Sequence, residues 1–261
     1  MIISILFAAS FGFAQENELK VCADPHDLPF SNQKQQGFEN KIAELVAQDL
    51  HANLHYVWQR MGKGFVREYI DNSTCDLLIG IPAGYRALLT TAPYYRSTYV
   101  FVVARNQKLV PVSLNDPVLR EMKKIGVQVL DDDYTPPAEA LARRGMQQEI
   151  VGFQTLGAGA SKIMGSVAQH KIDSAIVWGP FAGYYVKRFP GTLLLNPVSP
   201  EVDPPGLPFT FAISMGVRKG NTELKFQLEQ VLERRRQDIR RILENYGVPQ
   251  LALVSQTPTS E

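Results

Sequence analysis

The sequence contains few cysteines, no marked excess of positive or negative charge, and almost no long apolar runs. Only two of the 261 residues are cysteine, and no further ligands lie near them at a zinc-site spacing, so we expect no structural zinc. After the N-terminus, proline, glycine or charge interrupts every apolar run, so no later segment is expected to span a membrane. Because 27 Lys and Arg residues nearly balance 26 Asp and Glu residues and no basic stripe is present, nucleic acid is not an expected partner.

The N-terminus has the apolar character of an export signal. Met1–Ala14 carries no charge and ends in small and apolar residues before the polar run Gln15–Asn17. This pattern is typical of the apolar region of a secretory signal with its cleavage site. The positively charged start of such signals is missing, which fits either a start site further upstream or a weak signal. We assign residues 1–18 to a signal-peptide-like segment and expect an exported, periplasmic protein.

Both cysteines lie in strand-like runs. Cys22 belongs to the run 19–23, and Cys75 opens the run 75–81. If these strands are neighbours in one parallel sheet, their Cα atoms fall within the window of about 4.4 to 6.8 Å that a disulfide needs. An oxidising compartment favours that bond. We therefore expect a Cys22–Cys75 disulfide, with two buried free thiols as the alternative.

Strand-like and helix-like patterns alternate along the chain. Apolar residues at Phe38, Ile42 and Val46 have helical spacing, and the runs before and after them read as strands. This alternation predicts parallel sheets flanked by helices. The expected strands cover residues 19–24, 54–58, 75–80, 94–105, 124–129, 149–154, 172–177 and 209–217, and the expected helices cover 38–50, 65–70, 137–144, 160–169 and 223–246.

Five segments carry a resemblance to a known family: Val21–Phe30, Gly37–Leu50, Cys75–Gly80, Thr91–Val102 and Lys171–Tyr185. Over roughly residues 19–246 the chain resembles the family 3 extracellular solute-binding proteins. The resemblance implies an α/β fold of the type II periplasmic binding proteins, with two lobes that each contain a mainly parallel sheet and are joined by a hinge. We expect lobe one in 19–105 and 208–250, lobe two in 106–207, and a flexible tail in 251–261.

Shorter runs narrow this resemblance to one subgroup. CADPHDLPFSN, PAGY, PYYRSTYVF and VWGP are similar to the periplasmic binding proteins associated with PQQ-dependent dehydrogenases, the J-protein type of methanol oxidation. The similarity implies a non-enzymatic accessory that contacts a PQQ-dependent alcohol dehydrogenase and carries no cofactor of its own. The alternative is a substrate-binding receptor of an ABC transporter for a small solute other than an amino acid.

The sequence departs from the pattern with which amino-acid-binding relatives hold their ligand. Arg86 lies near the place of the arginine that clamps the ligand carboxylate, but the preceding loop differs and is about one residue short, so a surface arginine is the alternative. Trp178 stands where the ammonium-binding acid is expected, five residues beyond Asp173. Its indole offers an apolar face and one donor. It either forms a stacking platform in the cleft or fills the lobe interface.

Residues that follow the first strand are further candidates for the cleft. Asp24, His26, Asp27 and Phe30 lie beyond the end of that strand, where open α/β sheets place their binding residues. We include Asn40 of the GFEN run with them. The alternative for the loop is a turn made rigid by its prolines.

Three more candidates begin the long strand near the hinge. Tyr94, Tyr95 and Arg96 either line the cleft or a partner surface, since tyrosine and arginine are frequent interface anchors, or they pack the interlobe strand and pair with an acid of lobe two.

Metal binding and catalysis are not expected. Asp131–Asp133 offers hard oxygen ligands, but the run lacks the alternating spacing and the glycine of a calcium loop, so we expect a helix-capping acidic turn. His26 has no nucleophilic partner that a motif identifies, and no acid–base pair stands out. The sequence therefore predicts neither an enzyme nor a metal site.

Overall fold

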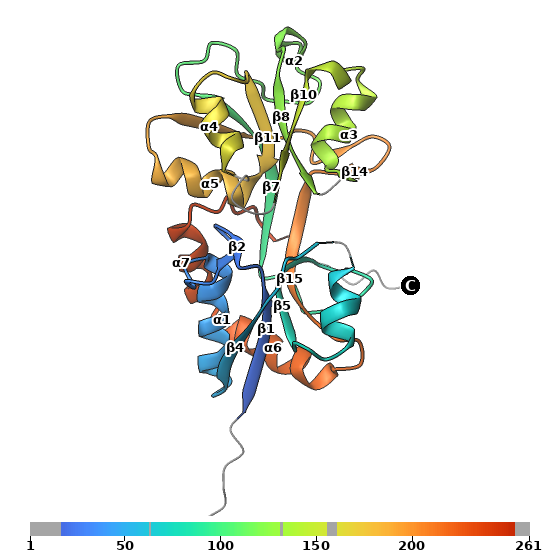
Figure 1. The fold of residues 1–261 in the computed structure, drawn as a ribbon, viewed down its shortest axis with the longest axis vertical. Coiled ribbons are helices and arrows are strands. Elements are labelled where there is room, and N and C mark those ends of the chain that lie inside the picture. The colour runs from blue at the N-terminus through green and yellow to red at the C-terminus, as the bar shows by residue number, and fades with distance from the viewer. Residues whose placement is uncertain (1–16, 63, 131–132, 156–160, 254–261) are drawn as a thin grey trace, which may run out of the picture.

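Two lobes stack along the long axis of the molecule, and long strands join them (Figure 1). The computed structural model describes residues 17–62, 64–130, 133–155 and 161–253. Within these ranges, no helix combines the length and the apolar character that crossing a membrane requires. The expected signal segment lies almost wholly outside the described residues and stays a prediction.

Strands alternate with helices, as the sequence pattern predicted. The strands are β1 (Glu18–Ala23), β2 (His26–Asp27), β3 (Ser31–Asn32), β4 (Asn53–Trp58), β5 (Leu77–Pro82), β6 (Leu89–Thr90), β7 (Tyr95–Ala104), β8 (Ile125–Leu130), β9 (Asp133–Tyr134), β10 (Ile150–Gln154), β11 (Ser174–Trp178), β12 (Leu193–Pro197), β13 (Val202–Asp203), β14 (Leu207–Pro208) and β15 (Thr210–Val217). The helices are α1 (Phe38–Asp49), α2 (Val118–Glu121), α3 (Pro136–Arg143), α4 (Lys162–Ala168), α5 (Gly179–Arg188), α6 (Thr222–Arg234) and α7 (Arg236–Asn245), with short helical turns at Val66–Asp71 and Gln147–Glu149.

Each lobe is built on three parallel strands. In lobe one, which also holds α1, α6 and α7, β1 pairs in parallel with both β4 and β5. In lobe two, which holds α2 to α5, β8 pairs in parallel with both β10 and β11. Between them, β7 and β15 run antiparallel to their neighbours, so that one strand order, β10-β8-β11-β7-β15-β5-β1-β4, continues through both lobes. The predicted two-lobed α/β fold is confirmed.

Strand β7 changes partners where the lobes meet. Its residues Tyr95 to Thr98 pair with β15, and the next residue, Tyr99, is opposite Trp178 of β11. Further along, Val100 to Ala104 pair with β12. The expected division of the chain at residues 105 and 208 stays a prediction, and these registers put the change of strand partners between Thr98 and Tyr99.

Helix α1 shows how the sequence pattern creates the core of lobe one. Phe38, Ile42 and Val46 are fully buried and belong to one cluster with Val21 of β1 and Met215 of β15. Residues three or four apart lie on the same helix face, so the apolar spacing turns one side of α1 toward the sheet. Burying each such side chain contributes roughly 1.5 to 3 kcal/mol.

The C-terminal helix differs from its prediction. One helix over 223–246 is wrong, because α6 ends at Arg234 and α7 starts at Arg236. The two residues at the break, Arg234 and Arg235, both pair with Asp49 at the end of α1. The apolar residues follow one stripe along both α6 and α7, so the periodicity in the sequence did not reveal the break between them. Helix α5 and strand β12 were not predicted as separate elements.

The disulfide is confirmed. Cys22 and Cys75 are bonded, with their Cα atoms 5.7 Å apart. The bond lies in a small apolar cluster with Phe65, Ile70 and Leu78. Strands β1 and β5 are direct neighbours, which is the arrangement that the two strand-like runs predicted.

The segment after α7 forms a third connection between the lobes. The Ser97 Oγ donates to the Pro249 carbonyl at 2.6 Å, and the Leu251 N–H donates to the Arg96 carbonyl at 2.8 Å. Gly183 of α5 and Gly247 touch so closely that a Cβ on Gly183 would lie 1.9 Å from the Gly247 oxygen. The two backbones can meet this closely only because both residues lack a side chain.

We expect the double variant Cys22→Ser/Cys75→Ser to lose about 4 kcal/mol of unfolding free energy, because the bond closes a long loop and restricts the unfolded chain. Urea unfolding of the variant and of the wild type, with and without a reducing agent, measures this loss. The reduced wild type should match the double variant, and equal stability of reduced and oxidised wild type would contradict the structural role of the bond.

Gly165 of α4 and Gly183 of α5 should respond to alanine with opposite signs. Gly183→Ala should destabilise by about 1 to 3 kcal/mol, because the new methyl group overlaps the Gly247 backbone. Gly165→Ala is the matched control: nothing lies within 4 Å of its Cβ position, so it should stabilise by about 0.5 to 1 kcal/mol through helix propensity. Urea unfolding measures both, and a stabilising Gly183→Ala would disprove the close contact.

Candidate functional site

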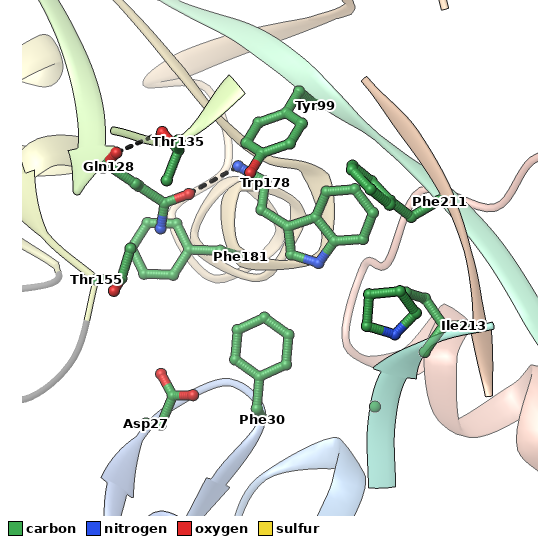
Figure 2. A pocket seen from close by; sticks show the side chains of 12 residues that line it. Asp27, Phe30, Tyr99, Gln128, Thr135, Thr155, Trp178, Phe181, Phe211 and Ile213 are labelled. Atoms are coloured by element: carbon green, nitrogen blue, oxygen red, sulfur yellow. Dashed lines mark hydrogen bonds between the residues drawn. The ribbon is translucent and has the colours of Figure 1, made fainter. Parts of the chain in front are cut away.

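A cavity of about 290 Å³ lies between the two lobes. Figure 2 shows the side chains around it. Lobe one and its crossing strand contribute Asp27, Phe30, Gly80, Pro82, Phe211 and Ile213, while lobe two and the second half of β7 contribute Tyr99, Gln128, Thr135, Thr155, Trp178 and Phe181. Most of these side chains are apolar or aromatic, and the few polar groups are placed at separate points. This is the usual make-up of a small-molecule pocket.

Three aromatic rings form one wall of the cavity. The centroid of the Trp178 ring lies 5.4 Å from that of Tyr99 and 5.8 Å from that of Phe211, at interplanar angles of 63° and 74°. Such edge-to-face contacts fix each ring against its neighbours. The strand registers bring them together, because Tyr99 is directly opposite Trp178 across β7 and β11. Phe30 faces this wall from lobe one (Figure 2).

Gln128 fixes the backbone of Trp178. The Trp178 N–H donates to the Gln128 Oε1 at 2.8 Å, and the Thr135 hydroxyl donates to the Gln128 carbonyl. Gln128 is buried within the otherwise apolar strand β8. A buried amide needs hydrogen-bond partners, and this one uses its oxygen to fix the start of α5, from which the indole enters the cleft.

Two carboxyl groups lie together on the lobe-one side. Asp27 lines the cavity, and Glu39, from the first turn of α1, packs against Gly80 at the cavity edge. A Cβ on Gly80 would lie 1.8 Å from the Glu39 Oε1, and Gly80 has φ +82°. Glycine is therefore required there both by the backbone and by the acid. Neither carboxylate has a cationic partner among the residues that the structure describes.

Burial shifts the titration of both acids upward. It raises the pKa of Asp27 to about 7, with a smaller contribution from the nearby charge of Asp24. It raises the pKa of Glu39 well above its usual range, and the charge of Asp27 adds to that shift. Burial likewise raises the pKa of Tyr99 far above its ordinary value. Near neutral pH, Asp27 is therefore the ionisable group in the cavity that is closest to its titration point.

Comparisons with known proteins identify the family of the chain. The model of the bacterial extracellular solute-binding proteins, family 3, matches residues 19–249. The chain belongs to that family. It is 30% identical to protein MoxJ of Paracoccus denitrificans, over 94% of each chain. Among solved structures, MxaJ from Methlophaga aminisulfidivorans MPT has a TM-score of 0.80 at 27% identity, over 89% of this chain and 100% of that one. XoxJ from Methylobacterium extorquens AM1 has a TM-score of 0.74 at 37% identity, over 90% and 100%.

Three of the residues predicted for the cleft line it: Asp27, Phe30 and Trp178. Asp24 lies elsewhere. It is buried, and its two carboxylate oxygens accept hydrogen bonds from the His26 N–H at 2.8 Å and the Met61 N–H at 3.1 Å. Asp24 thus closes the turn after β1, which is the alternative that the prolines suggested. The His26 side chain is exposed.

Asn40 and Arg86 also lie outside the cavity lining. The Asn40 Oδ1 accepts from the Gly37 N–H at 3.0 Å and from the Asn32 N–H at 3.1 Å, and so caps the start of α1. Arg86 is exposed in the loop between β5 and β6. Arg86 therefore does not take the place of the arginine with which amino-acid-binding relatives hold the ligand carboxylate.

The three candidates near the hinge lie outside the cavity lining. Tyr95 is buried and packs its ring against Phe38, at 6.5 Å, and against Tyr94, at 5.1 Å. Arg96 pairs with Glu201, an acid within the range expected for lobe two, as one alternative for it predicted. Of the acidic turn, Asp131 and Asp132 lie outside the described residues, so the metal alternative stays untested.

Sequence reasoning missed several residues of the cavity. Tyr99, Phe211 and Glu39 belong to regular elements whose apolar pattern gave no sign that they border a cleft. Gln128 and Thr155 carried a usable signal. Each is a polar residue in or directly after an apolar strand, at the strand end where α/β folds bind ligands.

The raised pKa of Asp27 gives a pH-dependent stability. Because the folded protein binds this proton up to about pH 7 while the unfolded chain releases it near pH 4, the stabilisation is complete below pH 4 and is lost as the pH rises toward 7. Urea unfolding between pH 4 and pH 8 should show stability falling by up to about 1.4 kcal/mol per pH unit for this one proton.

Matched variants isolate the source of that dependence. Asp27→Asn should flatten the curve, whereas Glu233→Gln, an exposed position on α6, should leave it unchanged. Glu39→Gln should flatten it further at higher pH, since the pKa of Glu39 is raised in the same direction. Superimposable curves for wild type and Asp27→Asn would refute the buried acid.

Proposed function

We propose that this protein is a periplasmic, non-enzymatic accessory of a PQQ-dependent alcohol dehydrogenase system and that it acts through contact with a protein partner. The observation that carries the proposal is Trp178 in the cleft, with Tyr99 and Phe211 packed around it. The scaffold keeps the two lobes of a solute receptor, but its cleft presents an indole where amino-acid receptors present an acid.

Capture of amino acids fits this cleft poorly. A bound zwitterion needs a cation for its carboxylate, since an unpaired buried charge is costly. The described lining contains no arginine or lysine, and Arg86 is exposed outside it. A carboxylate would instead meet the Asp27 and Glu39 carboxyl groups.

The side chains of the cavity also favour a role without catalysis. A general acid or base works with a nucleophile or with a second group whose pKa lies near the working pH. Among the lining residues described, Asp27 and Tyr99 are the titratable ones, and burial raises the pKa of Tyr99 away from neutrality. This leaves Asp27 without an acid–base counterpart among the lining residues, and the neighbouring Glu39 lies outside the lining with a pKa well above its usual range.

The rim of the cleft offers anchors for a protein partner. Tyr134, 70% exposed, directly precedes the lining residue Thr135, and Tyr85, 45% exposed, lies in the loop that follows the lining residue Pro82 at the end of β5. Exposed tyrosines are frequent hot spots of protein interfaces. The two side chains come from opposite lobes, so one partner surface would contact both.

A transport receptor for a small solute is the second candidate. The cavity itself favours it, because about 290 Å³ accommodates a small organic molecule. Ligand-dependent shifts of the melting temperature discriminate between the candidates, since a ligand that binds only the native state raises its stability. A receptor shows such a shift with its transported solute and needs no dehydrogenase.

The accessory role predicts two results. A strain that lacks the protein should lose most of its PQQ-dependent alcohol dehydrogenase activity in the periplasm, and tagged protein should recover the dehydrogenase. In surface plasmon resonance with that dehydrogenase, the double variant Tyr85→Ala/Tyr134→Ala should bind at least about tenfold more weakly, the effect expected of interface hot spots.

Phe226→Ala is the control, because Phe226 is an aromatic residue with 58% exposure on α6, in lobe one and away from the cleft (Figure 1). It should bind the dehydrogenase as wild type does. Unchanged dehydrogenase activity in the deletion strain, together with no recovered dehydrogenase, would reject the accessory role.

A further inference from the structure

We propose that the cleft binds a small organic cation that carries a hydroxyl group, an amino alcohol, with its ammonium group between the aromatic wall and Asp27 and its hydroxyl group at Thr155. This goes beyond the accessory role and does not depend on it, since the dehydrogenase has no part in the binding.

The aromatic wall provides the first requirement of a cation site. Faces of Trp, Tyr and Phe rings attract a positive charge, and quaternary ammonium groups are recognised by cages of such rings. Trp178, Tyr99 and Phe211 border the cavity with their centroids 5.4 to 6.4 Å apart, and Phe30 faces them across the space (Figure 2). Four rings around one cavity of about 290 Å³ match the size of a trimethylammonium group and a short chain.

Asp27 provides the second requirement. Its side chain is partly buried, points into the cavity in Figure 2, and accepts no hydrogen bond from a described residue. Burying a carboxylate in this way is costly unless a cation pairs with it. A ligand ammonium group would supply the missing partner, and the aromatic rings would exclude water from the pair.

The other groups around Asp27 strengthen a preference for positive charge. Asp24 faces it from the turn after β1, Glu39 from α1, and Tyr185 from α5. The first two are acids, the third is a phenol whose pKa is raised by burial, and the described lining holds no basic residue. A ligand that enters this side of the cavity therefore meets acidic groups and, among the described lining residues, no basic one.

Thr155 provides the group for the other end of the ligand. Its Oγ1 is buried, has no hydrogen-bond partner among the described residues, and belongs to the cavity lining on lobe two, whereas Asp27 lies on lobe one. Buried hydroxyl groups are nearly always satisfied. A ligand hydroxyl group there would satisfy it, and would connect the two lobes through one molecule.

Titration calorimetry with the full chain tests the charge and the hydroxyl group separately. Choline is the probe, 3,3-dimethyl-1-butanol is its uncharged carbon isostere, and tetramethylammonium has the charge without the hydroxyl group. At pH 8 choline should bind about tenfold more tightly than the isostere, the size expected of a desolvated cation–π contact with a carboxylate nearby. Between pH 8 and pH 6 its affinity should fall by up to about tenfold, as Asp27 takes up a proton.

Three variants assign the residues. Asp27→Asn should remove the pH dependence and weaken choline by about tenfold, and Trp178→Leu, which keeps an apolar side chain, should weaken both cations alike. Thr155→Val should weaken choline about threefold to tenfold and leave tetramethylammonium unchanged. Glu233→Gln, on the exposed face of α6, is the control and should bind as wild type does.

The proposal is overturned if neither cation binds at 10 mM, or if the uncharged isostere binds as tightly as choline. Unfolding midpoints show whether each variant is folded. If Trp178→Leu does not fold, the comparison of choline with its isostere on the wild type still decides the question. Binding of choline by wild-type protein with no effect of Asp27→Asn would place the cation elsewhere and would equally refute the site.

Discussion

The antiparallel pairing of β7 with β15 is the constraint on which the rest of the structure depends. Tyr95 to Thr98 pair with Thr210 to Ile213, and from this ladder β15 continues beside β5 in lobe one while β7 continues beside β11 in lobe two. The position of every cleft residue relative to the other lobe follows from this register. A slip of one strand by one residue would put Tyr99 and Phe211 on opposite faces of the sheet and would separate the rings of the aromatic wall.

Most of the fold could be predicted because the sequence encodes it locally. The alternation of strand and helix patterns, the apolar face of α1 and the strand-like run that contains each cysteine all depend on neighbours within a few residues. The errors come from interactions between distant segments. The break at Arg235 accompanies the pairing of Arg234 and Arg235 with Asp49, about 185 residues earlier in the chain, and no local pattern reports such a partner.

The site could be predicted only in part for the same reason. Trp178, Asp27 and Phe30 follow strand ends, where the fold places ligand-binding residues, so sequence and family together indicated them. Tyr99 and Phe211 reach the cleft from the middle or the start of long strands, through the crossing of the lobes. Glu39 reaches it because Gly80 leaves room for its carboxyl group. Asp24 and Asn40 have the right residue types at plausible places, yet nearby backbone N–H groups occupy their oxygens.

Comparison with other acids of this chain shows what is unusual about the two carboxyl groups at the cleft. Asp203 is buried, but Arg144 pairs with it, with one hydrogen bond of 2.9 Å, and keeps its pKa below the usual range. Asp49 is held in the same way by two arginines. At Asp24 backbone N–H groups satisfy the carboxylate, and at Asp203 and Asp49 the sequence supplies a guanidinium group. Asp27 and Glu39 lack one among the described residues, and burial raises the pKa of both. Keeping them unpaired lowers the stability of the folded protein at neutral pH. A cost of this kind is retained where a site needs an unsatisfied charge, and in this cleft no described residue supplies the group that would relieve it.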